Sequence, residues 1–124
     1  MVEAENDPLT EKIIACCFEV HKQLGPGFPE KVYHNSLKIL FSDRKIDYVS
    51  EKEFGVFFNN KKVGDFRCDL LVEQKVIVEL KSVTGIMPIL FRNQLISYLK
   101  ASKIKTGLLI NFGNKSCEIK RVSY

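Results

Sequence analysis

The stretch VIVELKSV at residues 76–83 constrains the fold most, because charged side chains interrupt an otherwise apolar strand. Successive side chains of a strand point to opposite faces of a sheet. Glu79 and Lys81 therefore share one face with Ile77, whereas the other face is wholly apolar. Taking a carboxylate and an ammonium group out of water costs free energy. These two groups therefore either face solvent or line a cleft in which they take part in chemistry.

The preceding strand brings a second carboxylate close to this position. The turn at residues 73–75 contains no glycine or asparagine, which disfavours a two-residue primed turn and favours a three-residue loop. Continuing the ladder from a three-residue loop sets Asp69 directly opposite Glu79. A two-residue turn would instead set Asp69 opposite Leu80, on the other face. We favour the first register because it places Asp69, Glu79 and Lys81 together.

Two neighbouring carboxylates with a lysine beside them are typical of a site for a hard divalent cation. Mg²⁺ prefers oxygen ligands and usually binds one or two carboxylates, with water and substrate phosphate completing its shell. Such an ion would relieve the repulsion between Asp69 and Glu79. Lys81 would hold the attacking water or neutralise developing charge. The alternative is an ordinary salt-bridge cluster at an exposed sheet edge, and the spacing alone does not exclude it.

The rest of the pattern predicts a single mixed α/β domain over residues 1–124, with residues 1–7 as a flexible N-terminus. Asp7 is expected to cap the first helix, which Gly25 ends. Helices are expected over residues 8–24, 29–43 and 89–101. Strands are expected over residues 48–58, 63–72, 76–81, 107–112 and 117–122. The predicted order is ααβββαββ.

Composition excludes several classes of protein. No apolar run approaches the ~20 residues that span a bilayer, and the acidic start of the chain lacks the apolar region of a signal peptide. We therefore expect a cytoplasmic protein without a membrane partner. The cysteines lack zinc spacing, which indicates reduced thiols. Residues 100–124 carry six Lys or Arg against one acid, which is either a solvated surface or a patch that faces phosphates.

Three groups of residues resemble known nucleases. Asp69 followed by VELK resembles the signature of the PD-(D/E)xK nuclease superfamily. Upstream, LGPGFPEKVY carries Gly27, Glu30 and Tyr33 at the spacing that names the GxxExxY protein family. Downstream, QLISYLKASKIKTGLLINFG is similar to the C-terminal half of that family. The resemblance extends over residues 9–122.

The resemblance implies a restriction-endonuclease-like core, a mixed β-sheet flanked by helices, and dependence on Mg²⁺ or Mn²⁺. It implies that Lys81 is the catalytic lysine. The metal ligands it implies are Asp69, Glu79, the carbonyl of Leu80 and Glu30. Gln94 corresponds to a glutamine on the helix that follows the lysine strand. Without the resemblance, Glu30 is a favourable acid at a helix N-terminus and Gln94 a surface amide.

Two positions depart from the pattern of these families, and one tyrosine and two histidines are expected to have structural roles. Cys68 stands where the superfamily has proline, and Phe91 stands where a polar residue is expected. Tyr33 is expected to be a core aromatic residue whose hydroxyl reaches a polar partner. His21 and His34 are expected to be packing or surface residues.

Two functions remain open from the sequence. The first is a Mg²⁺- or Mn²⁺-dependent nuclease that hydrolyses phosphodiester bonds of DNA or RNA, with water attacking phosphorus. The alternative is a non-catalytic module that keeps the nuclease fold and binds nucleic acid or a protein. In that case a homodimer or a protein partner would supply the specificity.

Overall fold

The structure is a computed structural model that describes residues 7–124. Residues 1–6 lie outside this part, and so does most of the N-terminus that was expected to be flexible. The helices are α1 (Pro8–Leu24), α2 (Glu30–Asp43) and α3 (Ile89–Ser102). The strands are β1 (Tyr48–Ser50), β2 (Glu53–Phe58), β3 (Lys61–Arg67), β4 (Leu70–Val72), β5 (Val76–Lys81), β6 (Thr106–Asn111) and β7 (Glu118–Ser123). Asp7 caps α1 as predicted, because its carboxylate accepts the Leu9 N–H.

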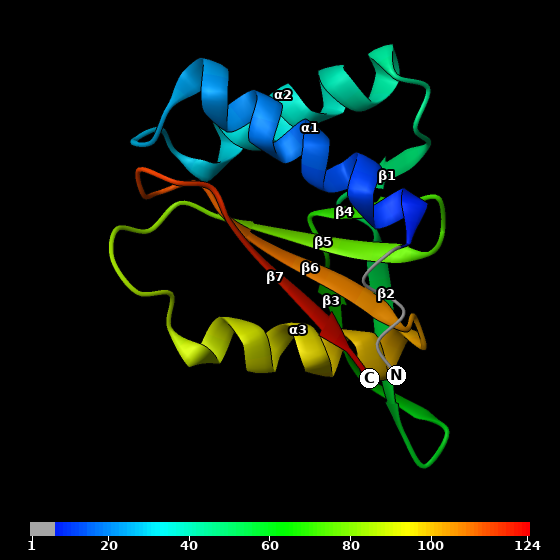
Figure 1. Cartoon of the computed structure of the whole chain (residues 1–124). Coiled ribbons are helices and arrows are strands. Elements are labelled where there is room, and N and C mark those ends of the chain that lie inside the picture. Colours follow the sequence, from blue (N-terminus) through cyan, green and yellow to red (C-terminus); the bar gives the residue numbers. More distant parts are fainter. Residues whose placement is uncertain (1–6) are drawn as a thin grey trace.

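A five-stranded sheet in the order β1-β4-β5-β6-β7 forms the centre of the molecule, with helices on both faces (Figure 1). Helices α1 and α2 cover one face, and α3 covers the other. Strands β5 and β6 are parallel, and the other neighbouring pairs are antiparallel. The architecture is therefore the predicted mixed α/β sheet flanked by helices.

The sheet separates two apolar cores, and β5 contributes to both. Val76, Val78 and Leu80 pack in the core beneath α1 and α2, whereas Ile77 packs in the core beneath α3. Because side chains alternate along a strand, Glu79 lies on the α3 side with Ile77. The predicted division of this strand into an apolar face and a partly charged face is confirmed.

The single strands predicted over residues 48–58 and 63–72 are wrong, because each is divided. The first breaks after β1, where Glu51 has a left-handed φ of 55°, and the second breaks at Cys68. Strands β2 and β3 pair with each other in a separate two-stranded sheet. The observed order is therefore ααβββββαββ. An alternating pattern indicates extended backbone but does not indicate which sheet the strand joins.

The hairpin of β4 and β5 has the predicted register. Val72 pairs with Val76, and the ladder continues to Leu70 and Val78. The loop between them therefore has the three residues expected from the sequence.

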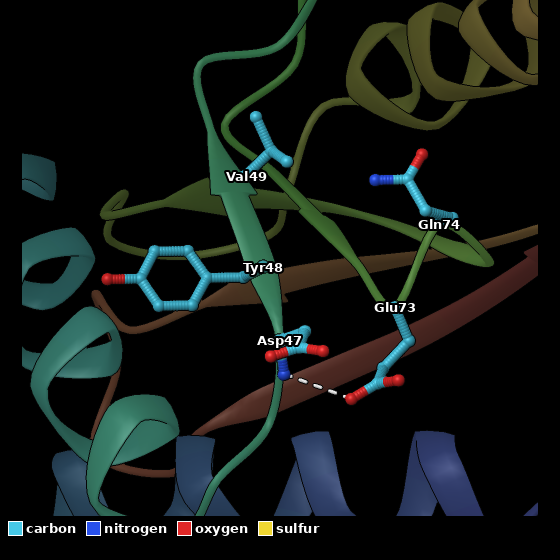
Figure 2. A pocket seen from close by; sticks show the side chains of 5 residues that line it. All are labelled: Asp47, Tyr48, Val49, Glu73 and Gln74. Carbon is cyan, nitrogen blue, oxygen red and sulfur yellow. Dashed lines mark hydrogen bonds between the residues drawn. The ribbon is translucent and has the colours of Figure 1, made fainter.

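The backbone conformation of this loop differs from the one expected from its composition. Glu73 and Gln74 adopt left-handed φ values of 54° and 58°, which are typical of a primed turn although neither is glycine or asparagine. Lys75 N–H donates to the Val72 carbonyl at 2.9 Å. Glu73 also exchanges hydrogen bonds with Asp47, whose N–H donates to its carboxylate at 2.9 Å (Figure 2). These contacts with the neighbouring segment outweigh the local preference for glycine.

Candidate active site

Asp69 and Glu79 lie side by side, where the chain passes from β3 to β4. Glu79 Oε2 accepts a hydrogen bond from the Asp69 N–H at 2.9 Å. Asp69 Oδ2 accepts one from the Leu80 N–H at 2.7 Å. The proximity expected from the register is therefore present, although the β4–β5 ladder itself ends at Leu70. The second oxygen of each carboxylate takes no part in these two bonds.

A second negative charge is disfavoured at this carboxylate pair, because Glu79 is buried beside Asp69. Glu79 is only 6% exposed. Burial, followed by the charge of Asp69, raises the pKa of Glu79 to about 8, against the opposing effects of the Asp69 N–H and of Lys81. Burial and the same two carboxylates raise the pKa of the adjacent Cys68 thiol to about 12. A cation at this position would neutralise the excess charge.

Lys81 ends β5 beside this pair, and an aromatic ring on α3 holds its ammonium group. The Lys81 Nζ lies 4.3 Å from the centroid of the Phe91 ring. A cation over an aromatic face is attracted by the ring quadrupole. Phe91 stands where a polar residue was expected from the sequence, and its ring supplies this contact.

Glu30 is the first residue of α2, in the layer on the other face of the sheet, yet its charge reaches the site. Partial burial raises the pKa of Glu30, the Lys81 ammonium opposes this, and Asp69 adds to it. Within residues 7–124, no three Asp, Glu, His or Cys side chains form a group that could hold a metal ion. Glu30 therefore lies within electrostatic reach of Asp69 and Lys81, and its role as a metal ligand stays a prediction.

Tyr33 organises the loop that leads into α2. Its ring is buried and stacks on Phe112 with the ring centroids 4.4 Å apart. Its hydroxyl donates to the Gly25 carbonyl at 2.6 Å and accepts from the Phe28 N–H at 3.2 Å. The expectation of a core aromatic residue with a hydrogen-bonded hydroxyl is confirmed.

The same loop is attached to the strand that carries Lys81. Ser82, the residue after β5, donates its hydroxyl hydrogen to the Phe28 carbonyl at 2.7 Å. The start of α2 is thereby fixed against the end of β5. This contact explains how a helix on the opposite face of the sheet places Glu30 within electrostatic reach of Lys81.

Two asparagines hold the segment that follows Lys81, and the sequence analysis assigned neither of them a role. Buried Asn111, at the end of β6, accepts from the Val83 N–H and donates to the Val83 carbonyl, both at 3.0 Å. Asn114 accepts from the Gly85 N–H and donates to the Gly85 carbonyl, both at 2.8 Å. The available signal was an amide at the end of the apolar strand GLLIN, because a buried amide needs partners.

The remaining predicted residues have simpler surroundings. Gln94 is exposed on α3, and its role stays a prediction. One turn further along, Tyr98 stacks on Phe66 of β3 with the ring centroids 4.0 Å apart. Burial, then the charges of Glu79 and Asp69, raise the pKa of Tyr98. Tyr98 therefore lies within electrostatic reach of the carboxylate pair, which the sequence analysis did not predict.

The two histidines are hydrogen-bonded within the fold. His21 Nε2 lies 2.9 Å from the Asn114 carbonyl oxygen, and His34 Nε2 lies 3.0 Å from the Ser50 hydroxyl. Their expected structural roles agree with these contacts.

A cavity of about 250 Å³ lies at the opposite end of the β4–β5 hairpin (Figure 2). Asp47, Tyr48, Val49, Glu73 and Gln74 line it. None of the predicted site residues is among them, so this cavity is separate from the Asp69–Glu79 pair.

The chemistry of the donors at the pair fits a hard divalent cation. Asp69 and Glu79 offer carboxylate oxygens and Leu80 offers a carbonyl oxygen, which are the ligands that Mg²⁺ and Mn²⁺ prefer. The raised pKa of Glu79 shows that a compensating positive charge is favourable at this place. The pair can therefore serve as the protein part of a metal site, with a lysine next to it.

A solved structure supports the fold that the sequence predicted. The crystal structure of SSO0001 is similar to this one with a TM-score of 0.60 and 17% sequence identity. The match covers 75% of this chain and 48% of that chain, so this chain corresponds to about half of SSO0001. This likeness supports the observed fold, a mixed sheet flanked by helices, as expected.

Within residues 7–124, no helix is both long and apolar enough to cross a membrane.

Sequence comparison gives the family. A search of curated proteins gave no match. The family model described as the PD-(D/E)XK nuclease superfamily matches residues 7–122, almost the whole sequence. The chain belongs to the PD-(D/E)XK nuclease superfamily.

Proposed function

We propose that this chain is a metal-dependent nuclease that hydrolyses phosphodiester bonds of DNA or RNA. The observation that carries the proposal is the pairing of buried Glu79 with Asp69 beside Lys81, where the pKa of Glu79 is raised to about 8. A perturbed carboxylate with a specific charged partner is typical of functional sites. Superfamily membership implies a nucleic-acid substrate.

Each residue of the site has a proposed role. Asp69, Glu79 and the Leu80 carbonyl would hold Mg²⁺ or Mn²⁺. Such an ion lowers the pKa of water and polarises a phosphoryl oxygen. Lys81 Nζ stabilises negative charge that develops on the phosphate, and the Phe91 ring keeps this ammonium group in place.

One further acid, Glu30, and one amide, Gln94, complete the proposed site. Glu30 contributes negative charge at the edge of the site, and Gln94 orients a phosphate or water from α3.

The fixed loop around Tyr33 supports placement in the GxxExxY family, because it gives a physical reason for that spacing. We also propose that residues 1–124 act as one nuclease domain. Its cytoplasmic location stays a prediction from the sequence.

The direct test is cleavage of labelled single- and double-stranded DNA and RNA with Mg²⁺, Mn²⁺ or EDTA. Asp69→Asn should lower the cleavage rate on the order of 100-fold or more, because it removes a ligand charge. Its amide oxygen can still accept the Leu80 N–H, so the fold is retained. Asp43→Asn, at an exposed position at the end of α2, is the matched control. Cleavage in EDTA, or cleavage that Asp69→Asn leaves unchanged, would contradict the proposal.

The alternative is a non-catalytic module with a homodimer or a protein partner. Salt-dependent binding of nucleic acid without cleavage under any metal would select this alternative. The same conclusion would follow if calorimetry detected no binding of Mn²⁺ to the wild-type chain.

A further inference from the structure

The hairpin of β2 and β3 exposes aromatic side chains at its end. We define the hairpin tip as residues 57–63, with the sequence FFNNKKV. Phe57, Phe58 and Val63 are 64%, 67% and 63% exposed. A cluster of exposed apolar side chains on one projecting element is typical of a binding surface.

The base of this hairpin is fixed to the body of the protein, whereas the tip is not covered. Phe54 and Phe66 stack with their centroids 5.3 Å apart, and Phe66 stacks in turn on Tyr98 of α3. Figure 1 shows the hairpin crossing α3 and extending beyond it. The tip is therefore held out from the body by a rigid base.

The hairpin is also joined directly to the candidate site. Asp69 follows two residues after β3. The Glu51 N–H donates to the Asp69 carbonyl at 2.9 Å, and the Cys68 N–H donates to the Lys52 carbonyl at 3.0 Å. A proline at position 68 could not make the second bond. This crossing joint, residues 51–52 and 68–69, fixes the direction of the hairpin relative to Asp69.

The tip combines aromatic rings with positive charge. It contains two phenylalanines, two asparagines and two lysines, and no acid. The ring of Phe57 lies over Gly55, where a Cβ would be 2.9 Å from the ring. The ring therefore lies close to Gly55 while the side chain stays largely exposed. Lys62 lies 3.3 Å from Asp65, and Lys61 is exposed.

This combination matches single-stranded nucleic acid better than a duplex. Unpaired bases stack on aromatic side chains, and the neighbouring cations contact the phosphates. The bases of a duplex are already stacked on one another, so they are not available for the rings. Stacking is tolerant of sequence because every base has an aromatic face.

The length of β3 sets how far the tip lies from the site. From Lys61 to Arg67 the strand rises about 3.3 Å per residue, which gives a span of about 20 Å. A single strand that contacts both the tip and the site must bridge this distance.

We propose that the hairpin tip binds a single-stranded part of the substrate at a distance from the bond that is cut. Bases stack on Phe57 and Phe58, and phosphates contact Lys61 and Lys62. This inference rests on the proposed nuclease function, to which it adds the substrate class.

The test is fluorescence anisotropy in EDTA with single-stranded oligonucleotides of five and twenty nucleotides. Phe57→Ala/Phe58→Ala should weaken binding of the longer one, which can contact both the tip and the site, by about 10-fold or more. Phe57→Leu/Phe58→Leu keeps apolar bulk without an aromatic face, so it should weaken binding similarly. Phe18→Ala, which changes a phenylalanine that is 48% exposed on α1, is the matched control. Urea unfolding verifies that each variant folds.

Several outcomes would overturn the inference. One is wild-type affinity in the alanine variant, and another is wild-type affinity in the leucine variant. A third is loss of a dimer in light scattering with unchanged nucleic-acid binding, which would assign the tip to a second copy of the chain. Binding that depends on the tip, without cleavage under any metal, would support the inference while removing the nuclease function. Failure of the wild-type chain to bind any oligonucleotide would remove both.

Discussion

Replacing Glu79 with glutamine should stabilise the metal-free protein, and the gain should grow as the pH rises. Glutamine keeps an oxygen that can accept the Asp69 N–H, so the observed hydrogen bond is retained. It removes the negative charge that burial and Asp69 disfavour. The variant therefore separates the cost of the buried charge from the packing of the side chain.

The direction and size of the effect follow from the pKa of Glu79. Below about pH 4.5 the carboxyl group is protonated in both the folded and the unfolded chain. Between about 4.5 and 8 the unfolded chain ionises while the folded chain keeps its proton. The free energy of unfolding of the wild type then falls by about 1.4 kcal/mol per pH unit. By pH 7 the loss relative to the glutamine variant is about 3 kcal/mol, and above pH 8 it stops growing.

Urea unfolding in EDTA at pH 5, 6, 7 and 8 measures this difference. Glu53→Gln, at an exposed position on β2, is the control and should follow the wild type. Added Mn²⁺ should stabilise the wild type more than Glu79→Gln, because only the wild type offers both carboxylates. A gap between wild type and Glu79→Gln that stays constant from pH 5 to pH 8 would refute the reasoning.

Three further substitutions test the supporting residues. Phe91→Leu should lower the kcat for cleavage about two- to five-fold, because the Lys81 ammonium loses roughly 0.5–1 kcal/mol of attraction; Phe91→Tyr should restore it, and a change confined to KM would argue against positioning. Tyr33→Phe should lower the free energy of unfolding in urea by about 1–2 kcal/mol, because a backbone carbonyl loses its donor; wild-type stability would show that the hydroxyl bonds contribute nothing. Gly113→Ala should destabilise the fold by about 1–3 kcal/mol or more, because its Cβ would lie 2.2 Å from the Val83 carbonyl oxygen; a wild-type melting curve would contradict the packing described.

The placement of the carboxylates could be predicted because it depends on local rules. Alternation along β5 sets Glu79 and Lys81 on one face, and the loop length sets the register with Asp69. The loop reached this register through backbone angles that the sequence disfavours, since Glu73 is held by Asp47. The prediction of position was therefore correct, whereas the reason given for the turn was incomplete.

Other features depend on contacts between distant segments and left no local pattern. The chain leaves the five-stranded sheet after β1 and returns to it after Cys68, because β2 and β3 pair with each other. The sequence alternates without a break here, so it does not reveal this change of sheet. The role of Asn111 depends on the loop around Val83, which lies 28 residues away in sequence. The ring of Phe91 was noted as a departure, but its contact with Lys81 required the packing of α3.

The crossing joint at residues 51–52 and 68–69 makes the hairpin modular. The ladder between β2 and β3 is separate from the ladder between β4 and β5, so inserting residues at the Asn59–Asn60 turn leaves the register of the carboxylates unchanged. Each added pair of residues would lengthen the hairpin by about 3.3 Å. Evolution or design can therefore change the reach of this element without altering the arrangement of Asp69 and Glu79.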